Sequence, residues 1–404
     1  MRIIYLHQYF TTPQRPGATR SYEMARRLVA SGHEVDMVTS VRRPSDGGFK
    51  GWRQTEEAGI RVHWLYVPYS GSMLYPERMR AFFQFAWGAA LKAASLDGDV
   101  VFATSTPLTI ALPAVYAARR QKIPMVFEVR DLWPELPIAV GALRGWIPIA
   151  LARWLERFAY RNAVQIVAFS DGMKEGVLRT GYPEERIHVI PNGADVDLFD
   201  VPAEAGQAFR RQFDWLQDRP LVVYTGAFGF INGVDYLARL AAAVEKLAPE
   251  VRFLALGSGK QEQYIRETAA QLNVLGRTFF MPGRFPKVEM PKILSAADMA
   301  TSLFIDLPEM WANSANKFFD ALASGTPVAI NYQGWQAELL RETGAGIVLD
   351  VHDVESAANR LVQALRDRAW LRQAGATARR LAVERFSRDE LAKQLEAVLL
   401  EAVG

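Results

Sequence analysis

The chain has 404 residues, of which 50% are hydrophobic and 23% charged, an ordinary globular composition that predicts two or three domains. A formal net charge of +3 gives no support to nucleic acid as a partner. The charge is uneven, because the first 200 residues carry +4 and the remainder −1. We therefore expect any attraction to phosphate-rich surfaces on the N-terminal half.

The complete absence of cysteine excludes disulfide scaffolds, thiolate metal sites and cysteine nucleophiles. The five histidines are scattered and form no H-x-x-x-H pair, so we expect no histidine metal centre. The apolar run at the N-terminus is too short for a secretory signal. The longest uncharged apolar stretch near the middle, residues 81–91, is far below the roughly 20 residues that span a bilayer. These features predict a soluble, cytoplasmic protein.

Short β-branched runs alternate with helix-length segments along the N-terminal half. This alternation is typical of a parallel sheet covered on both faces. The expected strands are residues 3–6, 35–39, 62–65, 100–103, 125–129, 164–169 and 188–190, and three of the expected helices are residues 22–30, 108–120 and 148–161.

The run Pro191-Asn192-Gly193 breaks the pattern, which then restarts with strands expected at residues 221–224, 253–256, 278–281, 299–303, 328–330 and 346–349. We predict an α/β protein of two doubly wound, Rossmann-like domains, 1–195 and 196–386, facing across a ligand cleft at their strand C-termini. Residues 387–404 open with the S-x-x-E capping pattern and predict a C-terminal helix that packs back toward the first domain.

A polar loop follows the first expected strand and runs through Gly17 to Arg20 at the start of a helix. Glycine allows close approach to a ligand, and the helix N-terminus and Arg20 could hold a phosphate. An ordinary βα loop explains the segment equally well. The dinucleotide fingerprint G-x-G-x-x-G is absent, which disfavours NAD or FAD.

The strand at 125–129 ends in the run RDLWPE, which places Arg130 and Asp131 at a strand's C-terminal end. Asp131 could orient Arg130 or accept a proton from a sugar hydroxyl. An internal pair that holds the loop in shape is an equally good interpretation.

Glycine-containing turns follow several strands of the second domain. Such turns use glycine for steric reasons, but four of them in one domain, two with adjacent cations, favour a ligand site. The residues that we single out in these turns are Gly226, Phe228, Asn232, Gly257, Arg284 and Lys287.

The segment 311–328 has the strongest pattern. Asn313 or Ser314 could cap a helix that Gly325 and Pro327 end. Lys317 lies in the first turn, where a cation opposes the helix dipole unless an anion such as a diphosphate compensates it. Asp320 follows one turn later and can address the same ligand. A surface ion pair is the alternative interpretation.

These motifs resemble retaining, nucleotide-sugar-dependent glycosyltransferases of family 4, which have the two-domain GT-B fold. The resemblance covers nearly the whole chain, through the Gly17 loop, the run PNGAD at 191–195, Gly257-Ser258-Gly259 and the run DALASGTPV at 320–328. The runs RDLWPE at 130–135 and NKFFD at 316–320 are similar to bacterial enzymes of surface-polysaccharide synthesis, including N-acetyl-fucosamine transferases.

The resemblance implies that Asp320 holds the donor ribose and that backbone amides and cations hold the diphosphate. The chain departs from the family at three positions: the first glutamate of E-x7-E is Ala312, a common cation is Asn232, and a common histidine is Arg130. We therefore assign the phosphates to Arg284, Lys287 and Lys317 and the sugar to Glu309. Asn313, Ser314 and Asn316 complete the expected donor site. We give the acids at 195 and 197 no metal role and expect no cofactor.

The resemblance also implies transfer, with retention, of a hexosyl or N-acetylhexosaminyl group from a UDP-type donor to a polyprenyl-diphosphate-linked saccharide. Arg130, Asp131 and Lys317 are the expected catalytic residues. Arginines at 153, 157 and 161 beside Trp154 and Phe158 are compatible with contact to the inner face of the cell membrane. A nucleotide-sugar epimerase and a nucleotide-sugar-binding regulatory protein without transferase activity remain alternatives.

Overall fold

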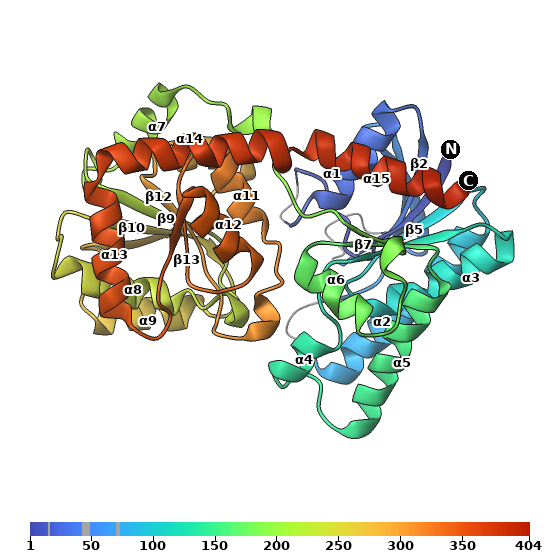
Figure 1. Cartoon of the computed structure of the whole chain (residues 1–404). Coiled ribbons are helices and arrows are strands. Elements are labelled where there is room, and N and C mark those ends of the chain that lie inside the picture. Colours follow the sequence, from blue (N-terminus) through green and yellow to red (C-terminus); the bar gives the residue numbers. More distant parts are fainter. Residues whose placement is uncertain (15–16, 43–48, 70–72) are drawn as a thin grey trace. The chain divides into compact units, whose positions relative to one another are not determined.

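The computed structural model describes residues 1–14, 17–42, 49–69 and 73–404, which form two α/β units (Figure 1). The first unit comprises residues 1–191 and 389–404, and the second comprises residues 192–388. The boundaries expected at 195 and 386 thus move by a few residues. The reason is a β-bridge within the second unit, where the Ala194 N–H donates to the Phe386 carbonyl and the Arg388 N–H donates to the Ala194 carbonyl.

The first unit contains an eight-stranded sheet in the order β3-β4-β2-β1-β5-β6-β7-β8. All neighbours are parallel except the antiparallel pair β3 and β4. Strand β3 carries the polar sequence WRQTEE at the sheet edge, which is why its apolar pattern is too weak to predict it. The strands are β1 Arg2–Leu6, β2 Glu34–Val41, β3 Trp52–Glu57, β4 Ile60–Tyr66, β5 Val100–Thr104, β6 Met125–Val129, β7 Gln165–Ala168 and β8 Ile187–Val189.

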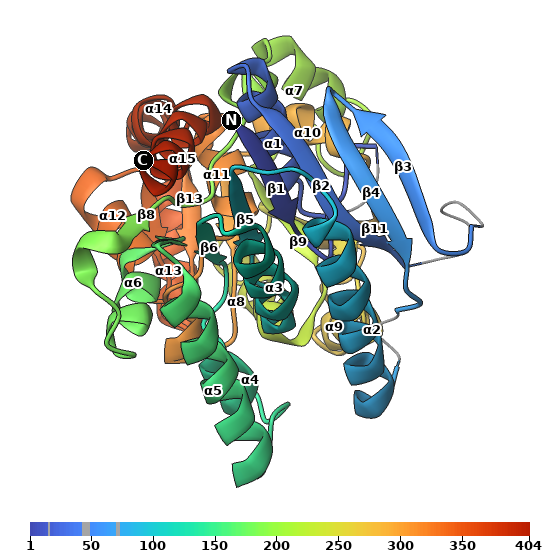
Figure 2. The same cartoon turned by 90° about the vertical axis from the view of Figure 1, so that its right-hand side faces the viewer.

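Helices cover both faces of this sheet. Helices α1 (Arg20–Ala30) and α15 (Arg388–Val403) share one core with the sheet, in which Leu391, Leu395 and Leu399 pack beside Leu28 and Ile3. The C-terminal helix from Asp389 on is therefore part of the first unit. Helix α3 packs against α2 and α5 on the opposite face (Figure 2). The other helices of the unit are α2 Tyr75–Ala94, α3 Ala111–Gln121, α4 Glu135–Ala139, α5 Trp146–Asn162 and α6 Asp171–Leu178.

The second unit contains a six-stranded, wholly parallel sheet in the order β11-β10-β9-β12-β13-β14. Its strands are β9 Leu221–Ala227, β10 Arg252–Ser258, β11 Phe279–Gly283, β12 Met299–Ser302, β13 Val328–Ile330 and β14 Gly346–Val348. All strands expected in both units are found. Two of them, at 125–129 and 328–330, have the expected bounds, and the ends of the others shift by at most three residues.

The sheet of the second unit lies between two apolar layers, one shared with α8, α9 and α13 and the other with α7 and α10. Its helices are α7 Ala203–Arg210, α8 Asp235–Glu245, α9 Glu262–Gln271, α10 Met290–Ala296, α11 Asn316–Ala323, α12 Trp335–Thr343, α13 Val354–Arg366 and α14 Arg368–Arg385. The predicted class, two Rossmann-like α/β domains with parallel sheets, is confirmed.

The strand order reverses at one place in each sheet. In the first unit the reversal lies between β1 and β5, and in the second between β9 and β12. Doubly wound sheets bind ligands at such switch points, beyond the carboxyl ends of the strands, because the loops there diverge and leave a crevice. Each unit therefore has one place where its functional residues should be sought.

Candidate active site

Lys317 occupies the switch point of the second unit. Its Nζ atom donates to the Tyr224 hydroxyl of β9 at 3.2 Å and to the Leu303 carbonyl just after β12 at 3.3 Å. It also lies 4.6 Å from the Tyr224 ring centroid and 4.7 Å from that of Phe304. The ammonium group thus projects from α11 toward the point where the strand order of the sheet reverses. Lys317 lies in the first turn of this helix, as the sequence predicted.

The environment of Lys317 is poor in compensating charge. No carboxylate forms an ion pair with it in the part of the chain that the structure describes, and Asp320 is no exception. Burial lowers the pKa of Lys317 to about 7. An ammonium held by one hydroxyl, one carbonyl and two aromatic rings is a site that an anion would stabilise.

Two side-chain oxygens lie near the start of the same helix without donors. Asn316 Oδ1 and Asp320 Oδ1 are buried and accept no hydrogen bond from any described residue. Burial raises the pKa of Asp320, and the charges of Arg388 and Lys287 partly offset this. Buried side-chain oxygens are normally hydrogen-bonded, so this amide oxygen and this carboxylate oxygen are suited to a ligand that brings hydroxyl or amide donors.

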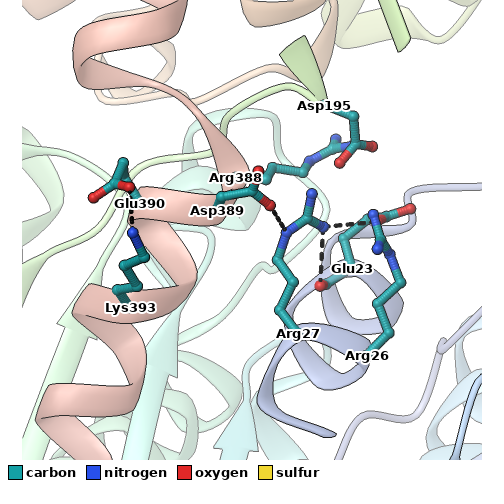
Figure 3. A network of polar contacts seen from close by, with 8 residues as sticks. All are labelled: Glu23, Arg26, Arg27, Asp195, Arg388, Asp389, Glu390 and Lys393. Atoms are coloured by element: carbon teal, nitrogen blue, oxygen red, sulfur yellow. Dashed lines mark hydrogen bonds and ion pairs between the residues drawn. The ribbon is translucent and has the colours of Figure 1, made fainter. Parts of the chain in front are cut away.

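Arg388, which influences Asp320, is itself held by an ion pair. Its Nη1 donates to Asp195 Oδ2 at 2.5 Å, and the arginine is buried (Figure 3). In the first unit, Asp389 accepts from Arg27 Nε at 2.5 Å. Asp195 is thus paired with a cation in the structure. No group of three or more metal-ligating side chains occurs among residues 1–14, 17–42, 49–69 and 73–404.

The segment before α11 corrects one expectation. The helix begins at Asn316 with Ala315 as its N-cap, so neither Asn313 nor Ser314 caps it. Both are instead buried and used locally: Asn313 Nδ2 donates to the Met310 carbonyl, and Ser314 Oγ accepts from the Asn192 N–H. The first N–H groups of α11 consequently lack a side-chain cap. Ala312, at the position of the missing glutamate, is buried, and Glu309 is half-buried in a short 3-10 helix.

The glycines of the second unit are demanded by the backbone. A Cβ on Gly257 would lie 1.8 Å from the Gly226 carbonyl oxygen, so β9 and β10 can approach only with glycine there. Gly226 has a φ of +152°, which disfavours other residues. Both glycines lie at the ends of their strands, and their donor-binding role stays a prediction.

The side chain of Phe228 lies in the core of the second unit. Its side chain is 1% exposed and packs in the hydrophobic core beside Tyr224, with ring centroids 6.2 Å apart. The ring therefore belongs to the core, and a role of Phe228 in donor binding, through its backbone, stays a prediction. The neighbouring Asn232 is half-buried in the 3-10 turn Phe230–Asn232.

The two cations after β11 differ in exposure. Arg284 is exposed and forms no ion pair within the described part of the chain, whereas Lys287 is half-buried and lies close enough for its charge to lower the pKa of Asp320. Lys287 thus lies near Asp320 of α11. Arg284 is on the same loop but is not tied to that group by any contact.

Arg20 has a structural role that the sequence did not reveal. It is 1% exposed, and its Nε and Nη2 donate to Glu128 Oε1 at 3.1 and 3.0 Å. Its Nη1 and Nη2 also donate to the carbonyls of Pro191 and Ile190. Because these donors are already used, we leave Arg20 out of the donor site. Gly17, before the same helix, is exposed with a φ of +146°.

Arg130 lies at the switch point of the first unit. Its backbone N–H donates to Ser105 Oγ at 2.9 Å, and its Nη1 donates to His7 Nε2 at 3.2 Å. A guanidinium cannot accept a hydrogen bond, so His7 is neutral with its proton on Nδ1. Burial, followed by the charge of Arg130, lowers the pKa of His7 well below its usual value. His7 therefore orients Arg130 without competing with it for an anion.

Asp131 does not pair with Arg130. Its Oδ2 accepts from Thr106 Oγ1 at 2.8 Å, so the internal Arg–Asp pair weighed from the sequence is not formed. Thr106 has a φ of +89°, an unusual conformation for a β-branched residue that marks many functional loops.

Three residues at the two switch points were not predicted from the sequence: His7, Tyr224 and Thr106. Their positions just after β1, within β9 and after β5 were the available signal.

Comparison with known proteins agrees with this architecture. Residues 17–193 match the family described as Glycosyl transferase 4-like domain, and residues 207–381 match Glycosyl transferases group 1. The first match lies in the first unit except for residues 192 and 193, and the second match lies within the second unit. Two Rossmann-like units that carry these two matches define the class of GT-B glycosyltransferases. The chain belongs to this class, with one Glycosyl transferase 4-like domain and one domain of Glycosyl transferases group 1.

Relatives show where in this family the similarity lies. The chain is 29% identical to the alpha-maltose-1-phosphate synthase of Mycolicibacterium smegmatis, over 67% of this chain and 71% of that protein. It is 22% identical to a UDP-Gal:alpha-D-GlcNAc-diphosphoundecaprenol alpha-1,3-galactosyltransferase of Escherichia coli, over 54% of this chain and 55% of that protein. The crystal structure of Anabaena HepE with UDP matches with a TM-score of 0.75 at 16% identity, covering 99% of this chain and 100% of that one.

Proposed function

We propose that the chain transfers a hexosyl or N-acetylhexosaminyl group from a UDP-sugar to a polyprenyl-diphosphate-linked saccharide, with retention, in the synthesis of a bacterial surface polysaccharide. The observation that carries the proposal is Lys317, a buried ammonium at the switch point with no carboxylate partner among the described residues. A solved relative of the same fold contains UDP, and one relative is named for transfer to a diphosphoundecaprenol saccharide.

The donor is assigned to the second unit. Lys317, Lys287 and Arg284, with the uncapped N-terminus of α11, would neutralise the diphosphate. Asp320 Oδ1, a buried acceptor without a donor, suits the hydroxyls of a ribose. The backbone at Gly226 and Gly257 would pass close to the ligand, because neither residue has a side chain.

The acceptor is assigned to the first unit, where His7 holds the guanidinium of Arg130 in place. Arg130 would bind the acceptor or stabilise developing negative charge, and Asp131 would accept from an acceptor hydroxyl. In the reaction the bond from the anomeric carbon to the diphosphate breaks and a bond to the acceptor oxygen forms. The acceptor proton passes to the leaving diphosphate oxygen, so the step needs no protein base.

Thermal-shift binding against UDP-, GDP-, dTDP- and ADP-sugars, with EDTA present throughout, tests the donor assignment. A ligand that binds only the folded chain raises its melting temperature by mass action. We expect a shift with UDP-sugars that Lys317→Ala reduces. If only a sugar of another nucleotide stabilised the chain, the proposed donor class would be wrong. If the chain formed an epimer of the UDP-sugar without any acceptor, the proposed reaction would be isomerisation and not transfer.

A further inference from the structure

Large apolar side chains project outward from the three helices α2, α3 and α5 of the first unit. On α2, Phe83, Trp87 and Leu91 recur every four residues and therefore lie on one side of the helix. Trp87 is 73% exposed. Since α3 packs between α2 and α5 (Figure 2), the outward sides of the three helices adjoin. We call this surface the apolar face; its members are Phe83, Trp87, Leu91, Tyr116, Ile147, Leu151 and Trp154.

Helix α5 carries two stripes side by side. Ile147, Leu151 and Trp154 recur at spacings of four and three and form the apolar stripe, in which Trp154 is 57% exposed. The arginines at 153, 157 and 161 recur every four residues and form an exposed basic stripe next to it. Trp154 therefore lies on the surface of the first unit and not in its core.

A groove of about 400 Å³ lies between α3 and α5. Its lining combines apolar and aromatic side chains with two arginines: Leu112, Val115, Tyr116, Phe158, Arg119 and Arg120. Trp154 stacks on Phe158 with ring centroids 5.3 Å apart, which joins the groove to the apolar stripe. The groove and the stripe are thus one continuous surface.

Acidic residues are almost absent from these helices. The sequence of α3 contains none, that of α2 contains only Glu77 in the first turn, and that of α5 contains only Glu156. Glu156 is buried and faces away from solvent. Apart from Glu77, the exposed charged side chains of these helices are positive, from arginines at 80, 119, 120, 153, 157 and 161.

We propose that the apolar face docks on an anionic lipid bilayer, with its tryptophans at the interface and its arginines on lipid phosphates. A helix with an apolar stripe bordered by arginines fits this environment, because the aromatic rings leave water while the guanidinium groups stay at the headgroups. Charge complementarity selects anionic lipid over neutral lipid. The inference rests on the proposed function only for the purpose of the docking, which is to bring the enzyme to a lipid-linked acceptor.

The test is flotation of the full chain with vesicles of phosphatidylcholine, with and without phosphatidylglycerol, at low and high salt and without nucleotide. We expect binding to the anionic vesicles. Arg153→Glu/Arg157→Glu should weaken it at low salt by at least about tenfold. Trp87→Ala/Trp154→Ala should remove the part of the vesicle binding that persists at high salt. All four side chains are exposed, and an unchanged melting temperature and UDP affinity would verify that each variant folds.

Two control variants change the same chemistry elsewhere. Arg372→Glu/Arg380→Glu alters exposed arginines of α14, and Tyr264→Ala removes an exposed aromatic ring of α9, 54% exposed. Both should bind vesicles like the wild type. Absence of binding to anionic vesicles, or equal losses in the controls, would overturn the proposal. A dimer in light scattering that Trp87→Ala/Trp154→Ala abolishes, without vesicle binding, would assign the face to a second copy instead. Donor binding is measured without lipid, so failure here leaves the proposed function intact.

Discussion

Binding of UDP beside Lys317 should take up a proton, because the buried amine of the free protein is only half protonated near neutrality. Burial lowers its pKa from 10.5 to about 7, which corresponds to roughly 5 kcal/mol lost by the ammonium on leaving water. A diphosphate returns a compensating charge and raises the pKa again. Above about pH 7, binding must therefore supply the proton that the free protein has lost.

The size of the effect follows from that pKa. Affinity for UDP should fall about tenfold for each pH unit above 7, so between about pH 7.5 and about pH 9 it should fall roughly 20-fold. Isothermal titration calorimetry in buffers of different ionisation enthalpy measures both the affinity and the proton uptake. The free chain should gain stability over the window from about 7 to 10.5, since there the unfolded state holds more protons than the folded one.

Two substitutions test whether Lys317 is the origin of this pH dependence of UDP binding. Lys317→Arg keeps a charge that does not titrate in this range, so its UDP affinity should be nearly flat with pH. Lys317→Met should bind UDP weakly at every pH and show no proton uptake. The reasoning is refuted if the wild-type affinity is constant over this range, or if it falls equally in wild type and Lys317→Met.

Three further outcomes are expected. Arg20→Met should cost about 3–5 kcal/mol in urea unfolding, because it leaves Glu128 buried and unpaired, and Arg20→Met/Glu128→Met should recover part of this loss. Asp320→Ala should abolish the preference for UDP over 2′-deoxy-UDP, measured as a ratio of dissociation constants; a preserved ratio would remove Asp320 from the ribose. Gly257→Ala should destabilise the chain by at least about 1–3 kcal/mol, because the new Cβ meets the Gly226 carbonyl, and a neutral result in thermal unfolding would contradict that packing.

The sheets could be predicted from sequence because their strands are buried on both faces and read as continuous β-branched runs. Strand β3 could not, since its polar edge sequence has no such pattern. The N-cap of α11 was predicted at the wrong residue for a different reason. Asn313 and Ser314 are good caps by type, but Asn313 bonds locally to the Met310 carbonyl and Ser314 accepts from the distant Asn192 N–H.

Contacts between residues that are far apart in the sequence could not be predicted, although they position the side chains at and around the site. Arg20 and Glu128 are 108 residues apart, and no local pattern indicates that one buried arginine serves the other. The same holds for His7 and Arg130, which meet only because β1 and β6 end at the same edge of the sheet. Lys317 could be singled out from sequence, because a cation in the first turn of a helix needs an explanation wherever the helix lies.

Acceptor-dependent transfer is the most direct test of the central claim. The chain is incubated in EDTA with a radiolabelled UDP-sugar that stabilises it and with a lipid extract containing polyprenyl-diphosphate-linked saccharides, and label is counted in the lipid phase beside released UDP. We predict label in the lipid phase, in equal amount to UDP, and a much larger loss of turnover than of stability in Lys317→Ala. Tight binding of the UDP-sugar without transfer or UDP release would contradict the account and identify a nucleotide-sugar-binding protein.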